Sequence, residues 1–358
     1  LFATLLQHSQ GLPGDAEELL ARGEREVKRL EEELSRVAAS LGSPDWRKLF
    51  ERYKAIHPSA DDLLAVYRRE LASAKRFVRA RELATIPPRD ALQVVETPEF
   101  ERASTPFAAY IPPPPFGRRG AAYFWVTPPG AEDSPEAREA RLRGHPTLDI
   151  ALTALHEGYP GHHLQFTWQS RLASPVRKIA HSAAMFEGWA LYCEQMMWEE
   201  GFFEDPRQEL MMLAAQLWRA CRVVADVRLH TKGMKRDEAA DLLAEVAGIE
   251  RPQARAEANR YTMSPTNPLS YMAGKWMLQD LRAELERRMG ATFNLGAFHD
   301  RVLSYGAIPI GLIVSDMLEE ADRARAPAAG KAGLRVGRGR AAASVRGKRL
   351  SSRKPGRA

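Results

Sequence analysis

The chain has 358 residues, 44% of them hydrophobic, which is enough to bury a substantial core in one large domain or two. Two cysteines, Cys193 and Cys221, fit no disulfide framework, and the lack of an apolar run of about 20 residues excludes a predicted membrane-spanning helix. The formal net charge of +6 arises at the end of the chain, because 12 of the 52 Lys and Arg follow Asp322 with no acidic residue among them, whereas the body carries 40 basic against 46 acidic residues.

Amphipathic helices are predicted in the first part of the chain. Residues 15–41, 45–56 and 61–83 carry charged faces and apolar residues at three- and four-residue spacing. They form a predicted N-terminal helical region, residues 1–85, which would serve equally as a coiled-coil hairpin or as a helical flank of a catalytic domain. The chain begins at Leu1 without a methionine, which suggests a truncated N-terminus and leaves the compartment open, cytoplasmic or exported.

The sequence changes character over residues 86–130, where a small sheet is predicted. Three runs rich in β-type residues, 92–96, 108–111 and 121–127, are separated by a proline run and by a Gly-Arg-Arg-Gly segment. Such a sheet either pairs with an extended substrate or only packs against helices.

An unusual histidine motif, His-Glu-Gly-Tyr-Pro-Gly-His-His, occupies residues 156–163. Neutral imidazoles are good zinc ligands, and a glutamate beside one can act as general base on a water whose pKa the metal lowers. In the short motif His-Glu-x-x-His both histidines share one helix face, but here Pro160 stands at the second histidine's position. Because proline and glycine break or bulge helices, Pro160-Gly161 is interpreted as a two-residue insertion.

This interpretation makes His156 and His162 the predicted metal ligands and Glu157 the general base. His163 is then a neighbour or a substitute ligand. The alternative is a solvated or capping histidine cluster at a helix break.

A third ligand is predicted in residues 181–200, a mostly apolar helical stretch. Glu187 lies among Phe186, Trp189 and Leu191, where a carboxylate would be costly to bury unpaired. Four small residues would let this helix approach the histidine helix closely: Ala183, Ala184, Gly188 and Ala190. Glu194, two turns on, either orients a ligand histidine or is solvated.

Helices are predicted for most of the remaining chain, and prolines begin several of them. Their ranges are 206–231, 235–247, 252–263, 268–289, 295–305 and 310–326. The basic segment 323–358 lacks hydrophobic periodicity and is predicted to be disordered, either as a solvated tail or as a weak binder of nucleic acid or anionic membrane.

Three polar residues near the end of the chain are further candidates. Tyr261 and Tyr271 flank a turn-rich segment, and either could donate to an oxyanion or serve only in packing. Lys275 would recognise a substrate carboxylate or be solvated. His299 is expected to cap or brace a helix, outside the metal site.

Several of these motifs together resemble the bacterial domain of unknown function 885 family, from about residue 80 to 320. They are His-Glu-Gly-Tyr-Pro-Gly-His-His-Leu-Gln, Glu-Gly-Trp-Ala-Leu-Tyr-Cys-Glu, Tyr271-Met-Ala-Gly-Lys275, the segment 298–303 and Gly306-Ala-Ile-Pro309. That family resembles zinc peptidases of the gluzincin type, in which two histidines and a downstream glutamate bind the metal. The resemblance implies a mainly α (α+β) fold with a zincin-like catalytic region at 86–322 and a small sheet beside the metal helix. It also implies residues 123–127 as the substrate edge and favours Tyr271 for the oxyanion.

The expected function is that of a zinc-dependent hydrolase, most simply a peptidase, with Zn²⁺ on His156, His162 and Glu187. Glu157 would transfer the proton and Tyr271 would steady the oxyanion. The expected partner is a peptide or another small amide, with no specific nucleic acid, and the oligomeric state stays open. The alternatives are a non-peptidase amide or ester hydrolase on the same site and an inactive binding or scaffold protein.

Overall fold

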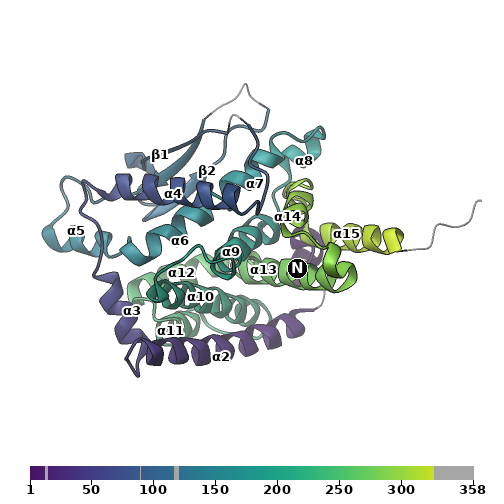
Figure 1. The fold of residues 1–358 in the computed structure, drawn as a ribbon. Helices are drawn as coiled ribbons and strands as arrows, with labels where there is room; N and C mark the ends of the chain where they lie inside the picture. The colour runs from purple at the N-terminus through teal and green to yellow at the C-terminus, as the bar shows by residue number, and fades with distance from the viewer. Residues whose placement is uncertain (13–14, 89, 117–120, 326–358) are drawn as a thin grey trace, which may run out of the picture.

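The computed structural model describes residues 1–12, 15–88, 90–116 and 121–325, and it is mainly helical with one small sheet, as predicted (Figure 1). The α-helices are α1 Phe2–Thr4, α2 Ala16–Ser40, α3 Trp46–Lys54, α4 Leu63–Ala80, α5 Pro135–Leu142, α6 Thr147–Glu157, α7 His162–Gln169, α8 Pro175–Ile179, α9 Ala183–Glu199, α10 Pro206–Thr231, α11 Arg236–Glu245, α12 Arg251–Met263, α13 Asn267–Met289, α14 Leu295–Leu303 and α15 Ile310–Arg325. A π-helical segment η1 (Leu5–Gln10) and two 3₁₀ turns, η2 (Glu99–Glu101) and η3 (Gly290–Thr292), complete the helical elements, and the strands are β1 Leu92–Glu96, β2 Ala108–Ile111 and β3 Ala122–Val126.

The first long helix, α2, lies along α10 (Figure 1). The side chain of Asp15 caps it by accepting a hydrogen bond from the backbone of Glu18, and Leu30 and Leu34 are fully buried. Residues 1–85 therefore flank the rest of the fold and share one hydrophobic core with it, rather than forming a separate coiled-coil hairpin.

The sheet has the strand order β1-β3-β2, with β1 parallel and β2 antiparallel to β3. The expectation that residues 123–127 form the substrate edge is wrong, because β3 is the central strand and its hydrogen-bonding groups pair on both sides. The edge strand that reaches the candidate site is β2.

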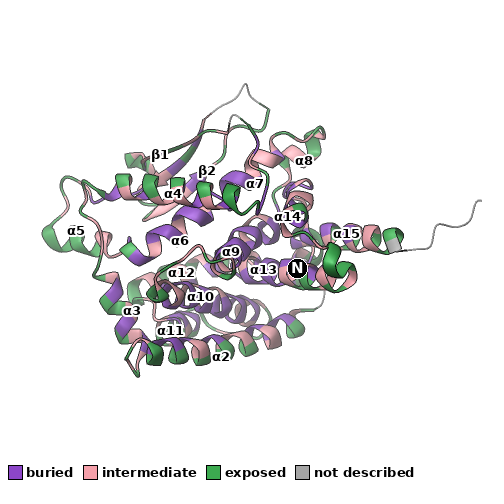
Figure 2. Cartoon of the chain, in the orientation of Figure 1, coloured by how far each residue is buried: buried purple, intermediate pink, exposed green. Residues whose placement is uncertain are grey.

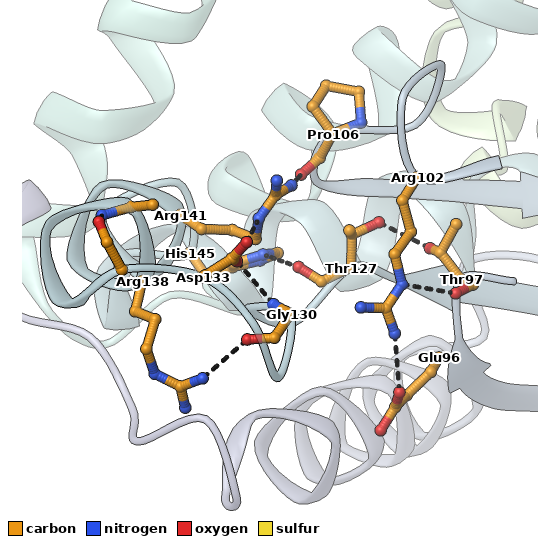
Figure 3. Close-up of polar contacts among 12 residues, drawn as sticks. Glu96, Thr97, Arg102, Pro106, Thr127, Gly130, Asp133, Arg138, Arg141 and His145 are labelled. Atoms are coloured by element: carbon orange, nitrogen blue, oxygen red, sulfur yellow. Dashed lines mark hydrogen bonds and ion pairs between the residues drawn. The ribbon is translucent and has the colours of Figure 1, made fainter. Parts of the chain in front are cut away.

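A polar network fixes one end of this sheet to the start of α6. The hydroxyls of Thr127 and Thr97 are hydrogen-bonded to each other, and Nε2 of His145 faces the Thr127 carbonyl oxygen (Figure 3). The two distances are 2.7 Å and 3.1 Å. Arg141 reaches the carbonyl of Pro106, just before β2, at 3.2 Å. These bonds position β2 relative to α6, the helix that carries the first histidine.

Helices α9 and α13, both largely buried, pack closely against each other (Figure 2). A Cβ on Gly188 would lie 2.5 Å from the Cα of Gly274, and a Cβ on Gly274 would lie 1.8 Å from the carbonyl oxygen of Ala184. The small residues of α9 do permit close approach, but Gly188 makes its close contact with α13 and not with a histidine helix.

His299 braces three segments from within the core. Its Nδ1 lies 2.6 Å from the carbonyl oxygen of Leu83, and its Nε2 lies 2.8 Å from the hydroxyl of Tyr192. The ring is fully buried, and this burial lowers the pKa of His299 to about 4. The expected bracing role is confirmed.

Helix α15 continues to Arg325. The prediction of disorder is therefore wrong for residues 323–325, which are helical. The rest of the predicted basic tail, 326–358, lies outside the described residues. Over the described part of the chain, no helix has the length and apolar character that crossing a membrane requires.

We predict that Gly274→Ala lowers the free energy of unfolding by about 3 kcal/mol, because the added methyl group meets backbone atoms of α9. Chemical denaturation would measure this change. Ala283→Ser, on the exposed face of the same helix, should stay within about 0.5 kcal/mol of the parent. Equal stability of the Gly274→Ala protein would contradict the close contact.

We also predict that stability falls as pH drops from about 6.5 towards 4, partly through His299. An unfolded histidine takes up a proton near pH 6.5, whereas the folded His299 stays neutral to about pH 4, so the unfolded state binds more protons in this window. The contribution reaches about 3 kcal/mol. A His299→Gln protein should show a flatter dependence of unfolding free energy on pH, and an unchanged slope would contradict the assignment.

Candidate metal centre

The histidine motif folds as a helix, a tight turn and a second helix. α6 ends at Glu157 and α7 begins at His162, as the Pro160-Gly161 break predicts. A Cβ on Gly161 would lie 1.9 Å from the carbonyl oxygen of His156, so only glycine fits at this point of the turn. The indole N–H of Trp189 on α9 donates to the Pro160 carbonyl at 2.9 Å and ties the turn to the next helix.

The turn brings His156 and His162 to the side chain of Glu187. Oε2 of Glu187 lies 3.8 Å from Nε2 of His156 and 3.4 Å from Nε2 of His162, and the potential ligand atoms all lie within 4.8 Å of one another. In a tetrahedral zinc site with bonds of about 2.1 Å, ligand atoms stand roughly 3.4 Å apart. The three residues therefore fit zinc in both type and spacing.

Glu194 holds the first histidine from behind. Its Oε1 lies 2.7 Å from Nδ1 of His156, and the carboxylate is buried. This contact orients the ring so that Nε2 faces Glu187. The role of Glu194 as an orienting carboxylate, one of two interpretations of the sequence, is the one the geometry supports.

Buried carboxylates around His156 create a strong preference for positive charge. Burial would lower the pKa of His156, but the neighbouring carboxylates of Glu187 and Glu194 raise it to about 10. Burial raises the pKa of Glu187, but His156 and His162 together lower it by more. The resulting pKa lies well below the usual range of a glutamate. A cation between these groups, such as a divalent metal, satisfies the same preference.

Glu157 lines a cleft together with the three ligand candidates. The volume of this cleft is about 510 Å³. Oε2 of Glu157 accepts a hydrogen bond of 2.9 Å from the backbone N–H of Tyr110 on β2. The edge strand thus orients the carboxylate that the sequence predicts as general base, and Ala108 and Ala109 of β2 also line the cleft.

His163 turns away from the other two histidines. Its Nε2 lies 3.6 Å from Oδ2 of Asp90, and its Nδ1 lies 3.4 Å from the hydroxyl of Tyr110. Asp90 also contacts Lys75 at 3.0 Å and the hydroxyl of Tyr159. His163 therefore anchors the turn to the segment before β1, and it does not join the ligand group.

The three late candidates have different positions. Tyr271 lines the cleft, where burial and the negative charge of Glu187 raise the pKa of its hydroxyl and keep it a donor. Tyr261 is fully buried and accepts a hydrogen bond from Arg222. Lys275 is only 1% exposed and donates to Gln216 at 2.6 Å, so it is neither solvated nor placed to meet a substrate.

Sequence reasoning missed four residues that line the cleft: Tyr110, His181, Arg219 and Arg222. The arginines carry the same signal that identified Glu187, a charge within an apolar helical pattern. Nothing in the sequence marks the backbone N–H of Tyr110 or the position of His181, which stacks on Phe186 with ring centroids 4.3 Å apart.

We predict that His162→Ala loses stoichiometric zinc and that His163→Ala retains it, because His162 lies beside Glu187 whereas His163 lies beside Asp90. Elemental analysis after removal of loosely bound metal would measure both. Zinc loss in His163→Ala with zinc retained in His162→Ala would overturn the ligand assignment.

We further predict that Glu194→Gln weakens zinc affinity about 10- to 100-fold without abolishing binding. An amide in this position keeps the hydrogen bond to Nδ1 of His156 but removes the negative charge that strengthens the ligand. Competition with a chromophoric chelator gives the affinity. An affinity unchanged from the parent would contradict the role of Glu194.

Comparison with known proteins identifies a family but no described activity. Residues 1–317 match the family described as "Bacterial protein of unknown function (DUF885)". A "putative lipoprotein of unknown function" from Shewanella oneidensis is similar at 28% identity and TM-score 0.81 over 88% of this chain, and a "putative lipoprotein" from Colwellia psychrerythraea at 24% identity and TM-score 0.80 over 90%. The chain spans 59% and 55% of the lengths of these two proteins. No curated protein matches the chain.

Proposed function

The chain belongs to the bacterial DUF885 family, and from its site we propose that it is a zinc-dependent hydrolase that cleaves peptide bonds. The observation that carries this proposal is the convergence of His156, His162 and Glu187 in a cleft that Glu157 also lines. The ligand order, two histidines and a downstream glutamate, is that of gluzincin-type peptidases and supports an amide as substrate. The lipoprotein descriptions of the two similar structures support an exported location.

His156, His162 and Glu187 would hold the zinc, which would act as a Lewis acid on the substrate carbonyl and would lower the pKa of a bound water. Glu157, fixed by the Tyr110 N–H, accepts the proton of the attacking water and passes it to the leaving nitrogen. The Tyr271 hydroxyl donates to the oxyanion that develops on the carbonyl.

The edge strand β2 supports a peptide substrate in particular. Tyr110 directs its N–H away from β3 to Glu157, so the cleft side of this strand carries backbone groups that the sheet does not use. An extended peptide can pair with such an edge, which orients the scissile bond relative to Glu157.

We predict that Glu157→Gln lowers kcat for peptide hydrolysis by about 10²- to 10⁴-fold while the zinc content stays unchanged. The reason is that glutamine keeps the size of the side chain but cannot accept and return a proton. Mass spectrometry of peptide mixtures, with and without chelator, would identify the products. Glu204→Gln, an exposed carboxylate change, serves as the control.

The same assay separates the alternatives. If the protein cleaves simple esters in a chelator-sensitive way but cleaves no peptide, it is a non-peptidase hydrolase and the proposed peptidase activity is wrong. A chain that binds no zinc when zinc is supplied would exclude the proposed chemistry altogether.

A further inference from the structure

The cleft contains a pair of arginines that the proposed hydrolytic chemistry does not use. Arg219 and Arg222 lie one helical turn apart on α10, and both line the cleft that holds Glu157 and Glu187. Lys275, which the sequence left open between a substrate carboxylate and solvent, is buried and donates to Gln216.

Arg222 is nearly buried but incompletely paired. Its side chain is 7% exposed, and its Nε donates to the Tyr261 hydroxyl at 2.9 Å. Glu257 lies 3.5 Å from Nη2, but Glu257 makes a closer contact of 2.7 Å with Arg260. Within the described residues, the terminal nitrogens of Arg222 make no hydrogen bond. A buried charge in this state gains from an anionic partner.

Aromatic rings hold the Arg222 guanidinium beside the candidate metal ligands. Its central carbon lies 4.3 Å from the ring centroid of Trp218 and 4.8 Å from that of Tyr271. Tyr271 in turn feels the charge of Glu187. Because Arg222 and Tyr271 line the same cleft as Glu157 and Glu187, a group bound by Arg222 lies in the cleft of the candidate ligands.

Arg219 adds a second cation with no ion pair among the described residues. Its Nε is buried without a hydrogen-bond partner, and Nη1 donates to the carbonyl of Ala215 at 3.2 Å. Asp149 lines a neighbouring cavity of about 250 Å³ that Arg219 also borders, but no ion pair within 4 Å joins the two in the described structure.

We propose that Arg222, assisted by Arg219, binds a carboxylate of the substrate, so that the enzyme acts on peptides with a free carboxylate near the scissile bond. The inference rests on the proposed function. The two arginines balance Glu157 and Glu187, and a divalent cation on the ligand group then makes the cleft positive, which favours an anionic substrate. The planar guanidinium matches a carboxylate with two parallel hydrogen bonds.

The carboxylate can be the C-terminus of a short peptide or the side chain of Asp or Glu, and matched peptides distinguish these sources. One pair of N-acetylated peptides differs by a free or amidated C-terminus, and a second pair, amidated throughout, differs by Glu or Gln. Their binding to Glu157→Gln protein is measured by calorimetry, and their cleavage by the parent enzyme is measured as kcat and KM. We expect the acid member of one pair to be favoured about 10- to 100-fold.

Variants assign the preference to α10. Arg222→Gln should remove most of it, chiefly through KM and the binding constant, and Arg222→Lys should keep a part because it keeps the charge. Arg219→Gln should reduce it less, and it remains informative if Arg222→Gln does not fold. Arg228→Gln changes an arginine of the same helix that pairs with Glu24 outside the cleft, and it should leave the preference intact.

The outcomes separate this inference from the proposed function. Equal binding and cleavage of acid and neutral peptides would overturn the carboxylate site and leave the peptidase standing. An acid preference in binding without any cleavage by the parent enzyme would support the site and count against the peptidase. Failure of every peptide to bind, or a preference that survives loss of both arginines, would overturn the inference.

Discussion

The turn between α6 and α7, held against α9, is the constraint on which the candidate site depends. Gly161 packs on the carbonyl of His156 with no room for a side chain, and Trp189 donates to the carbonyl of Pro160 from α9. The first contact keeps the turn tight, so that His162 lies near His156. The second holds α9 against the turn, so that Glu187 lies near both histidines. A continuous helix would carry the two histidines apart by rise and by rotation.

Several charged side chains are buried around the site, and most of those that orient the histidine motif are paired. Glu194 is bonded to His156, and Asp90 is bonded to Lys75 and Tyr159, so these carboxylates orient the motif. Glu187 and Arg222 differ from these carboxylates, because both line the cleft. A partly compensated carboxylate at a cleft can bind a cation, and a partly compensated guanidinium can bind an anion.

Most elements followed from local pattern. Strand β1 and helix α10 have the predicted bounds, because a polar cap, an N-terminal proline or a β-branched run acts within a few residues of where it stands. The candidate metal ligands were predicted from two histidines at close sequence spacing and from one carboxylate within an apolar helical pattern. The order of the strands could not be predicted from local pattern. It depends on pairing between segments that are separated in the sequence, and both β1 and β2 pair with β3.

By itself the sequence determined the helical class, the break at Pro160-Gly161 and the candidate set His156, Glu157, His162 and Glu187. These depend on backbone dihedral preferences and on the cost of burying a carboxylate, which are local properties. Only the tertiary structure shows that His163 lies beside Asp90 and not beside Glu187, that β2 borders the cleft, and that Arg222, not Lys275, lines it. These placements depend on contacts between side chains that are far apart in the sequence. Such contacts form only when the whole core packs together.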